Sequence, residues 1–248
     1  MRGLAPFWID PRDTDYLFPP VSLALDEPDG LLAIGGDLDP RRLLSAYRHG
    51  IFPWYNESQP ILWWSPNPRT VLFPAHLHVS RSLRKTLRRG TFRVTADSAF
   101  AAVLEACSGP RRGEHGTWIT REMKQAYRRM FELGHAHSVE CWEGETLVGG
   151  LYGIAIGGVF YGESMFSHRN DASKVAFVHL VRQLAAWGYG FIDCQVHSKH
   201  LESLGAETLP RERFIELLDQ WCPAAGHPGP WQLALPPEAG HAAREPKG

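Results

Sequence analysis

The order of strand-like and helix-like segments in the second half of the chain constrains its fold most strongly. Three strand-like segments succeed one another over residues 136–166, and the Gly157-Gly158 pair between the second and the third suits a tight hairpin turn. A helix is expected over 172–187, a strand over 190–196, and two further helices after that strand. Adjacent antiparallel hairpins followed by helix, strand and helix predict an α+β domain with a mainly antiparallel sheet.

This order of segments resembles the acetyltransferase-like (GNAT) fold. Acetyl-CoA enzymes of that fold carry an Arg/Gln-x-x-Gly-x-Gly/Ala loop, whose backbone amides bind the pyrophosphate. The corresponding loop here, residues 167–174, contains no glycine. The N-terminus of the next helix can still bind a phosphate, but not in the usual manner, so coenzyme A is not expected as a partner. A small-molecule acetyltransferase stays open as an alternative.

Two strand-like segments carry a carboxylate where a buried strand should be apolar: Glu163 within FYGESMFS and Asp193 within FIDCQ. A buried charge costs several kcal/mol, roughly, unless it is paired, so both acids are candidates for chemistry. The alternative is a structural ion pair or a cap. Strand alternation places Asp193 and Gln195 on one face, where both can hydrogen-bond a single ligand group. Cys194 is expected on the opposite face, packing as a small hydrophobe.

The segment around Glu163 needs one irregularity to form a site. In a regular strand Glu163 and Met165 share a face, whereas Phe160 falls on the other. A bulge near Gly162 brings Phe160 round to join them, and glycine within a strand often marks such a bulge. The result is an apolar pocket beside one acid, which suits an apolar side chain with a polar or charged neighbouring group.

The beginning and the end of the chain differ in composition from the middle. The beginning is rich in proline and aromatic residues, and Asp39-Pro40 predicts a helix cap followed by proline at the first helical position. A tryptophan on a proline-rigid loop in this part can stack on a nucleic-acid base. We expect a small N-terminal α/β domain over 1–64, an acetyltransferase-like domain over 65–222, and a disordered tail over 223–248, which is dense in proline, glycine and alanine.

The overall composition excludes several classes of protein. The net charge is −1, with 44% hydrophobic and 21% charged residues, which is ordinary for a globular protein and gives no global basic character. The longest uncharged stretch, 146–162, is too short and too glycine-rich for a membrane span. The four cysteines are widely spaced, which predicts a reduced, cytoplasmic compartment. Close histidine pairs lack partners at ligand spacing, so no metal site is expected.

Positive charge is nevertheless concentrated in one segment. Residues 71–96 contain no acidic residue, and a helix that begins after Ser80 is expected within them. Leu83 and Leu87 fall on one face of that helix and can anchor it. Four cations fall close to another face: Arg81, Lys85, Arg88 and Arg89. A stripe of one sign is the pattern expected for phosphate binding, although a merely solvated face is the alternative.

Seven short motifs follow one another along the chain: GIFPW at 50–54, WWSP at 63–66, GTWI at 116–119, GESMFS at 162–167, ASK at 172–174, IDCQ at 192–195 and LGA at 204–206. In these motifs the chain resembles the leucyl/phenylalanyl-tRNA–protein transferase family, over about residues 16–221. So many motifs in one order are more specific than any single short pattern. The stretch after Trp221 has no counterpart in the resemblance.

The resemblance implies an enzyme and a reaction. Such an enzyme moves leucine or phenylalanine, and less readily methionine, from aminoacyl-tRNA to the N-terminal Arg or Lys of a protein. The new N-terminus marks that protein for bacterial degradation by the N-end rule. The resemblance implies no metal and no soluble cofactor, and a GNAT-like domain behind a small N-terminal domain. A non-catalytic tRNA-binding module stays open as a second alternative.

The resemblance also implies roles for individual residues. Asp193 and Gln195 orient the attacking amine, with Asp193 acting either as a general base or only as an orienting group. Glu163 holds the α-amino group of the donated amino acid. The remaining roles are the side-chain pocket (Phe160, Met165 and Leu180, the last in place of an aromatic residue of some members), stacking on the terminal adenosine (Trp54 and Trp118), and contact with the tRNA acceptor arm (Arg81, Lys85, Arg88 and Arg89).

Overall fold

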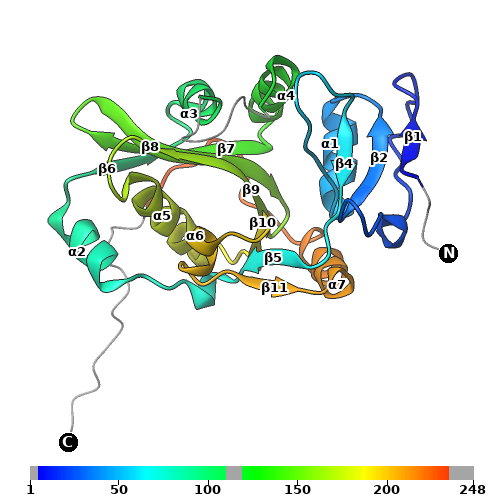
Figure 1. Cartoon of the computed structure of the whole chain (residues 1–248). Coiled ribbons are helices and arrows are strands. Elements are labelled where there is room, and N and C mark those ends of the chain that lie inside the picture. The colour runs from blue at the N-terminus through cyan, green and yellow to red at the C-terminus, as the bar shows by residue number, and fades with distance from the viewer. Residues whose placement is uncertain (1–4, 110–118, 235–248) are drawn as a thin grey trace, which may run out of the picture.

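The computed structural model describes residues 5–109 and 119–234 and contains two sheets (Figure 1). The smaller sheet has the strand order β1-β2-β4-β3, with β1 and β2 parallel and the other pairs antiparallel. Its elements are β1 (Phe7–Ile9), β2 (Leu31–Gly35), α1 (Pro40–Arg48), β3 (Phe52–Pro53) and β4 (Leu62–Trp64), with a 3₁₀ turn at Val21–Leu23.

The larger sheet has seven strands in the order β11-β5-β10-β9-β8-β7-β6. Every neighbouring pair in it is antiparallel except β9 and β10, which run parallel and are joined through a helix. Its strands are β5 (Arg69–Leu72), β6 (Arg93–Ala96), β7 (Ala136–Glu143), β8 (Thr146–Ile156), β9 (Val159–Ser167), β10 (Phe191–Gln195) and β11 (Glu207–Leu209).

Helices cover both faces of the larger sheet. Helix α5 (Ala172–Ala186) packs against one face, and α3 (Phe100–Cys107) and α4 (Arg121–Glu132) pack against the other (Figure 1). The buried side chains accordingly form two hydrophobic clusters, and the one beneath α3 and α4 continues into the smaller sheet. The remaining helices are α2 (Arg81–Arg89), α6 (Lys199–Glu202), α7 (Arg211–Trp221) and a 3₁₀ turn at Pro74–His76.

The predicted α+β architecture with a mainly antiparallel sheet is confirmed, as is the order of strands and helices that resembles the GNAT fold. Short elements escaped the sequence pattern: β5 and β11 have four and three residues, too few to show periodicity. Among the residues that the structure describes, no helix combines the length and the apolar character that crossing a membrane requires.

Two predicted helix starts are confirmed by their caps. The Asp39 side chain accepts a hydrogen bond from the Arg41 N–H at the start of α1, with proline at the first helical position. The Ser80 hydroxyl accepts from the Leu83 N–H at 3.2 Å at the start of α2. Leu83 and Leu87 are buried as expected, so they anchor α2 and leave its other side to solvent.

The start of the next helix has an unusual cap. Asp97 and Ser98 are residue types that favour the N-cap position, but α3 begins at Phe100, after Ala99. Asp97 instead accepts from the Ser138 N–H at 2.9 Å and lies 2.8 Å from Nδ1 of His137. A buried acid on the neighbouring strand, Glu140, accepts from the Ser98 and Ala99 N–H groups at 3.4 Å and so fixes the chain just before the helix begins.

Residues 223–234, the described part of the segment whose composition predicts disorder, contact the larger sheet through Trp231. Trp231 is only 1% exposed and stacks on the imidazole of His137 with ring centroids 3.8 Å apart. Its backbone N–H donates to the Asp97 carboxylate at 2.7 Å. A single buried aromatic residue therefore holds a segment whose composition predicted disorder, because one such side chain buries a large apolar area.

Candidate functional site

A cavity of about 360 Å³ opens where the larger sheet meets the connector after β3. Its wall is mostly apolar, and β8, β9, β10, α5 and α6 all contribute to it. Glu163 is the only carboxylate among its described lining residues. The lining comprises Phe52, Pro53, Trp54, Leu151, Tyr152, Phe160, Gly162, Glu163, Ser164, Met165, Phe177, Ile192, Cys194, Gln195, Val196, Ser198, His200 and Leu201.

Glu163 reaches this cavity through a bulge in β9. Opposite β8, Ser164 pairs with Tyr152 and Gly162 pairs with Gly153, so Glu163 has no partner residue across the strands. The predicted irregularity near Gly162 is therefore confirmed. It brings Phe160 and Met165 to the same cavity, as expected from the sequence. Nothing larger than glycine fits at Gly153, since a Cβ there would lie 2.2 Å from the Tyr161 carbonyl oxygen.

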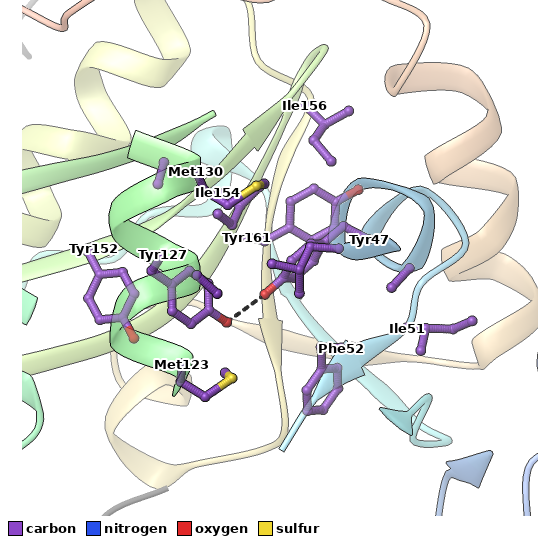
Figure 2. Packing of buried hydrophobic residues seen from close by; sticks show 14 of the residues in the cluster. Tyr47, Ile51, Phe52, Met123, Tyr127, Met130, Tyr152, Ile154, Ile156 and Tyr161 are labelled. Carbon is purple, nitrogen blue, oxygen red and sulfur yellow. Dashed lines mark hydrogen bonds between the residues drawn. The ribbon is translucent and has the colours of Figure 1, made fainter. Parts of the chain in front are cut away.

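Three neutral groups surround the Glu163 carboxylate, which is 8% exposed. The Tyr47 hydroxyl of α1 donates to Oε1 at 2.7 Å, the Tyr127 hydroxyl of α4 donates to Oε2, and the Gln195 amide donates to Oε1 at 3.1 Å. The two tyrosine hydroxyls also lie 2.8 Å from each other (Figure 2). Neither tyrosine was singled out from the sequence, because each belongs to an ordinary amphipathic helix.

The number of protons that the two tyrosines and Glu163 can share agrees with the raised pKa of Glu163. Burial raises the pKa of Glu163 to about 7, while the hydrogen bonds from Tyr127 and Tyr47 lower it and the charge of Asp193 raises it. With Glu163 ionised, each tyrosine gives its single proton to the carboxylate, and none remains for the contact between the hydroxyls. A protonated Glu163 supplies the third proton, so the carboxyl is poised between its two states near neutral pH.

Asp193 lies on the neighbouring strand in a different setting. Arg69 of β5 donates to both of its oxygens, through Nε at 2.8 Å and Nη2 at 2.6 Å, and neither side chain is more than 1% exposed. The Arg69 guanidinium also donates to the Gly50 carbonyl at 3.2 Å and lies over the rings of Phe52 and Phe214. Asp193 does not line the cavity. The ion pair that the sequence left open as an alternative is therefore present.

Gln195 departs from the predicted alternation. A register shift between Asp193 and Gln195 on the β5 side and a positive φ of 62° at Gln195 turn its side chain toward Glu163. The expectation that Asp193 and Gln195 share a face is thus wrong. Asp193 is linked to Gln195 through the backbone instead, since it accepts the Gln195 N–H at 2.9 Å. A non-glycine residue at positive φ is uncommon and points to a functional constraint.

Cys194 lies on the face opposite Asp193, as predicted, and lines the cavity. It is buried among apolar neighbours, and burial raises the pKa of its thiol well above the usual value. The thiol is thus held in its unreactive form, which agrees with the expected packing role.

Other predicted residues divide between the cavity and its surroundings. Trp54 lies at the cavity and is 45% exposed, with its ring edge-on to Trp64. Leu180 is fully buried in the core cluster and does not line the cavity, so its predicted place is wrong by one turn of α5. Phe177, one turn earlier, lines the cavity instead. Trp118 lies outside the described residues.

The predicted basic stripe is a face of α2. All four cations are exposed and form no ion pair within the described parts of the chain: Arg81, Lys85, Arg88 and Arg89. In residues 5–109 and 119–234, no three His, Cys, Asp or Glu side chains are grouped so that they can hold a metal ion.

Comparison with known proteins identifies close relatives. The sequence model described as leucyl/phenylalanyl-tRNA protein transferase matches residues 71–219, and the model of that protein's N-terminal domain matches residues 36–67. A leucyl/phenylalanyl-tRNA–protein transferase of Stutzerimonas stutzeri is 62% identical over 204 residues, covering 82% of this chain and 90% of that protein. One of Aromatoleum aromaticum is 61% identical over 214 residues, covering 86% and 90%.

Among solved structures the similarity is remote. L-PGS from Bacillus licheniformis matches with a TM-score of 0.39 at 10% identity, covering 67% of this chain and 53% of that one. A GCN5-related N-acetyltransferase from Kribbella flavida matches with a TM-score of 0.35 at 13% identity, covering 69% and 61%. Scores this low carry no argument about function.

Proposed function

The chain belongs to the leucyl/phenylalanyl-tRNA–protein transferase family, and from this premise we propose that it transfers leucine or phenylalanine, and less readily methionine, from aminoacyl-tRNA to the N-terminal Arg or Lys of acceptor proteins. The family is one of aminoacyltransferases, which is neither of the two alternatives left open by the sequence. We further propose that transfer takes place in the cytoplasm and marks the acceptor for N-end-rule degradation.

The observation that supports this function best is an apolar cavity with one buried carboxyl at its wall. The cavity suits the side chain of leucine or phenylalanine, and Glu163, held by two tyrosine hydroxyls and Gln195, suits the α-amino group beside it. An ammonium group entering there favours the ionised form of Glu163. Phe160, Met165 and Phe177 form the wall of the side-chain pocket.

The reaction needs orientation more than activation. The aminoacyl ester is already activated, and an α-amine has a pKa of about 7.7–8.0, so much of it is neutral near pH 7. Its nitrogen forms the new C–N bond, the ester C–O bond to the tRNA breaks, and the proton lost from nitrogen passes to the leaving oxygen. Holding amine and ester together contributes roughly 7–11 kcal/mol.

In this proposal Gln195 contacts the attacking amine, and Asp193 acts through Gln195. Asp193 is enclosed by Arg69 and binds the Gln195 N–H, so of the two roles that the sequence left open we favour orientation over proton removal. Trp54 and Trp118 stack on the terminal adenosine. The stripe on α2 (Arg81, Lys85, Arg88 and Arg89) contacts the acceptor arm of the tRNA.

The test is incubation of the protein with radiolabelled Leu-tRNA and a protein that begins with Arg. Label should pass to that protein and not to the same protein with an acetylated N-terminus. Asp193→Asn and Gln195→Ala should slow transfer far more than they weaken aminoacyl-tRNA binding. Absence of transfer by the unmodified protein overturns the function, and single-turnover rates near wild type in both variants overturn the residue assignment.

A further inference from the structure

A second cavity, separate from the first, lies at the beginning of α5. All of its described lining residues carry polar side chains, and the function proposed above does not use it. Its lining comprises Ser167, His168, Arg169, Asn170, Asp171, Ser173 and Lys174. It therefore contains the end of β9, the connecting loop and the first turn of a 15-residue helix.

The beginning of α5 is bonded only locally: the Ala172 N–H donates to the Arg169 carbonyl and the Ser173 N–H to the Ser167 hydroxyl. The N-cap residue Asp171 adopts a positive φ of 65° and makes no side-chain cap to the helix. Its carboxylate instead accepts from the Thr86 hydroxyl of α2 at 3.1 Å and lies 3.4 Å from Nζ of Lys174. The first turn of a long helix carries partial positive charge and attracts anions.

Ser173 gives a second and independent sign of a ligand. It is only 7% exposed, and it contributes to the cavity wall. Its N–H is satisfied by the Ser167 hydroxyl at 3.2 Å, but its own hydroxyl has no hydrogen-bond partner in the described parts of the chain. The residue is nearly buried, yet its hydroxyl oxygen is open to the cavity and can donate to an anion that enters there.

This second cavity lies between the basic stripe of α2 and the first, apolar cavity, which we call the donor cavity. On one side α2 packs against α5 and is joined to it by the bond from Thr86 to Asp171 (Figure 1). On the other side lies His200, which lines the donor cavity and whose pKa is lowered by burial and, to a lesser extent, by the charge of Lys174. Along β9, Ser167 follows Ser164 of the donor cavity by three positions, which is about 10 Å.

We propose that this second cavity binds a backbone phosphate of the single-stranded 3′ tail of the aminoacyl-tRNA. The proposal rests on the function proposed above, in which the 3′ end enters the donor cavity. A stacked strand advances about 3.4 Å per nucleotide, so the two cavities are two or three nucleotides apart. Lys174, the Ser173 hydroxyl and the start of α5 hold the phosphate between the donor cavity and the stripe of α2.

The charges that face the site decide how strongly it binds. Lys174 is half-buried and its contact with Asp171 is long, so it is available to an anion. Arg169 is mostly engaged with Glu143 at 3.0 Å, and His168 is exposed. Asp171 opposes an anion. Removing its charge should therefore tighten phosphate binding, whereas a purely structural role for this loop predicts weaker or unchanged binding.

The test uses an RNA stem–loop with a CCA 3′ tail, in which one tail phosphate at a time is replaced by an uncharged methylphosphonate. With the unmodified protein, one position should weaken binding by about tenfold, the loss of one charged hydrogen bond. Lys174→Gln should weaken binding of the natural tail similarly and abolish the sensitivity to that position. Ser173→Ala should have a smaller effect in the same direction, and Asp171→Asn should bind the natural tail more tightly.

Arg89→Gln on α2 is the matched control, because it should weaken binding of every tail equally and keep the sensitivity. If the unmodified protein and Lys174→Gln respond equally to a methylphosphonate at every tail position, the proposal is overturned. If coenzyme A alone competes for the site, the site belongs to a different ligand. If the unmodified protein transfers leucine while these results fail, only the phosphate site is refuted. If it transfers no leucine, the proposed function itself fails.

Discussion

Glu163 and Asp193 are both buried acids on neighbouring parallel strands, yet their surroundings are opposite. Asp193 is matched by a full positive charge, since Arg69 binds both of its oxygens. Glu163 is surrounded only by neutral donors, two tyrosine hydroxyls and one amide. Burial therefore raises the pKa of Glu163 to about 7, whereas the charge of Asp193 is compensated within the protein.

The difference assigns different work to the two acids. A compensated, fully enclosed carboxylate such as Asp193 holds its neighbours in place. Here it accepts the Gln195 N–H and so holds Gln195 in its positive-φ conformation. An uncompensated carboxyl such as Glu163, facing a cavity, responds to whatever charge enters it. The burial of an acid in a strand thus does not define its role, and the charge of its partners does.

The largest expected effect comes from removing the partner of Asp193. Arg69→Met leaves a buried carboxylate with one N–H donor, which should lower the free energy of unfolding by about 3–5 kcal/mol. Urea unfolding of the variant and of the unmodified protein measures this loss of stability. The double variant Arg69→Met/Asp193→Leu should regain most of that stability, because a buried ion pair can be replaced by apolar groups at little cost. Transfer should stay impaired in the double variant; restored transfer would mean that Asp193 does not position Gln195.

The second effect concerns the stability of the protein against pH, because no positive charge compensates Glu163 as Arg69 compensates Asp193. Its pKa is raised from an ordinary 4.5 to about 7, so between those values the folded protein binds more protons than the unfolded chain. The free energy of unfolding should therefore fall as the pH rises through this window and level off above it. Relative to Glu163→Gln, which does not titrate, the loss should be on the order of 3 kcal/mol.

Urea unfolding of both proteins at a series of pH values measures this difference. Titration of other groups affects both proteins alike, so only the difference between the two curves is assigned to Glu163. A difference that does not change with pH between 4.5 and 7 would show that Glu163 is compensated like Asp193, and the contrast between the two acids would disappear.

The third effect tests a cavity residue, Met165, that is not a hydrogen-bond partner of either acid. Met165 faces the donor cavity, and shortening it by Met165→Ala should admit side chains branched at Cβ, which are stiff at χ1. The preference for Leu-tRNA over Ile-tRNA should then fall by about 1–3 kcal/mol in kcat/KM. The pH dependence of transfer should not change. Equal use of Leu and Ile by the unmodified enzyme would contradict the assignment of this pocket.

The contrast between the two acids was only half visible in the sequence. Polar residues within apolar strands marked Glu163 and Asp193, and the glycine before Glu163 predicted the bulge that the structure contains. Arg69 was not foreseen because its strand has four residues and lies 124 positions away from Asp193. Pairing across such a separation follows from sheet order, which local pattern does not encode.

Gln195 and Trp231 show where local rules mislead. Alternation placed Gln195 beside Asp193, but an irregularity of one residue at the strand end reverses the side chain. Composition predicted disorder around Trp231, yet its ring is stacked on His137 and buried. In both cases one tertiary interaction, a backbone hydrogen bond or an aromatic contact, outweighs the preference of the surrounding segment.

The smallest expected effect concerns how the two tyrosine hydroxyls set the pKa of Glu163. The Tyr127 hydroxyl donates to its carboxylate and lowers its pKa, and Tyr47 does so to a lesser extent. Tyr127→Phe should therefore raise the Glu163 pKa by about half to one unit, which corresponds to one hydrogen bond of about 1 kcal/mol. Tyr47→Phe should raise it less.

The pKa of the Glu163 carboxyl can be followed by ¹³C NMR of protein with labelled glutamate, with Glu163→Gln assigning the signal. Tyr161→Phe is the matched control, since that buried hydroxyl contacts Cys222 and not Glu163. A Glu163 pKa that moves equally in all three variants would mean that packing, and not the hydroxyl protons, sets it.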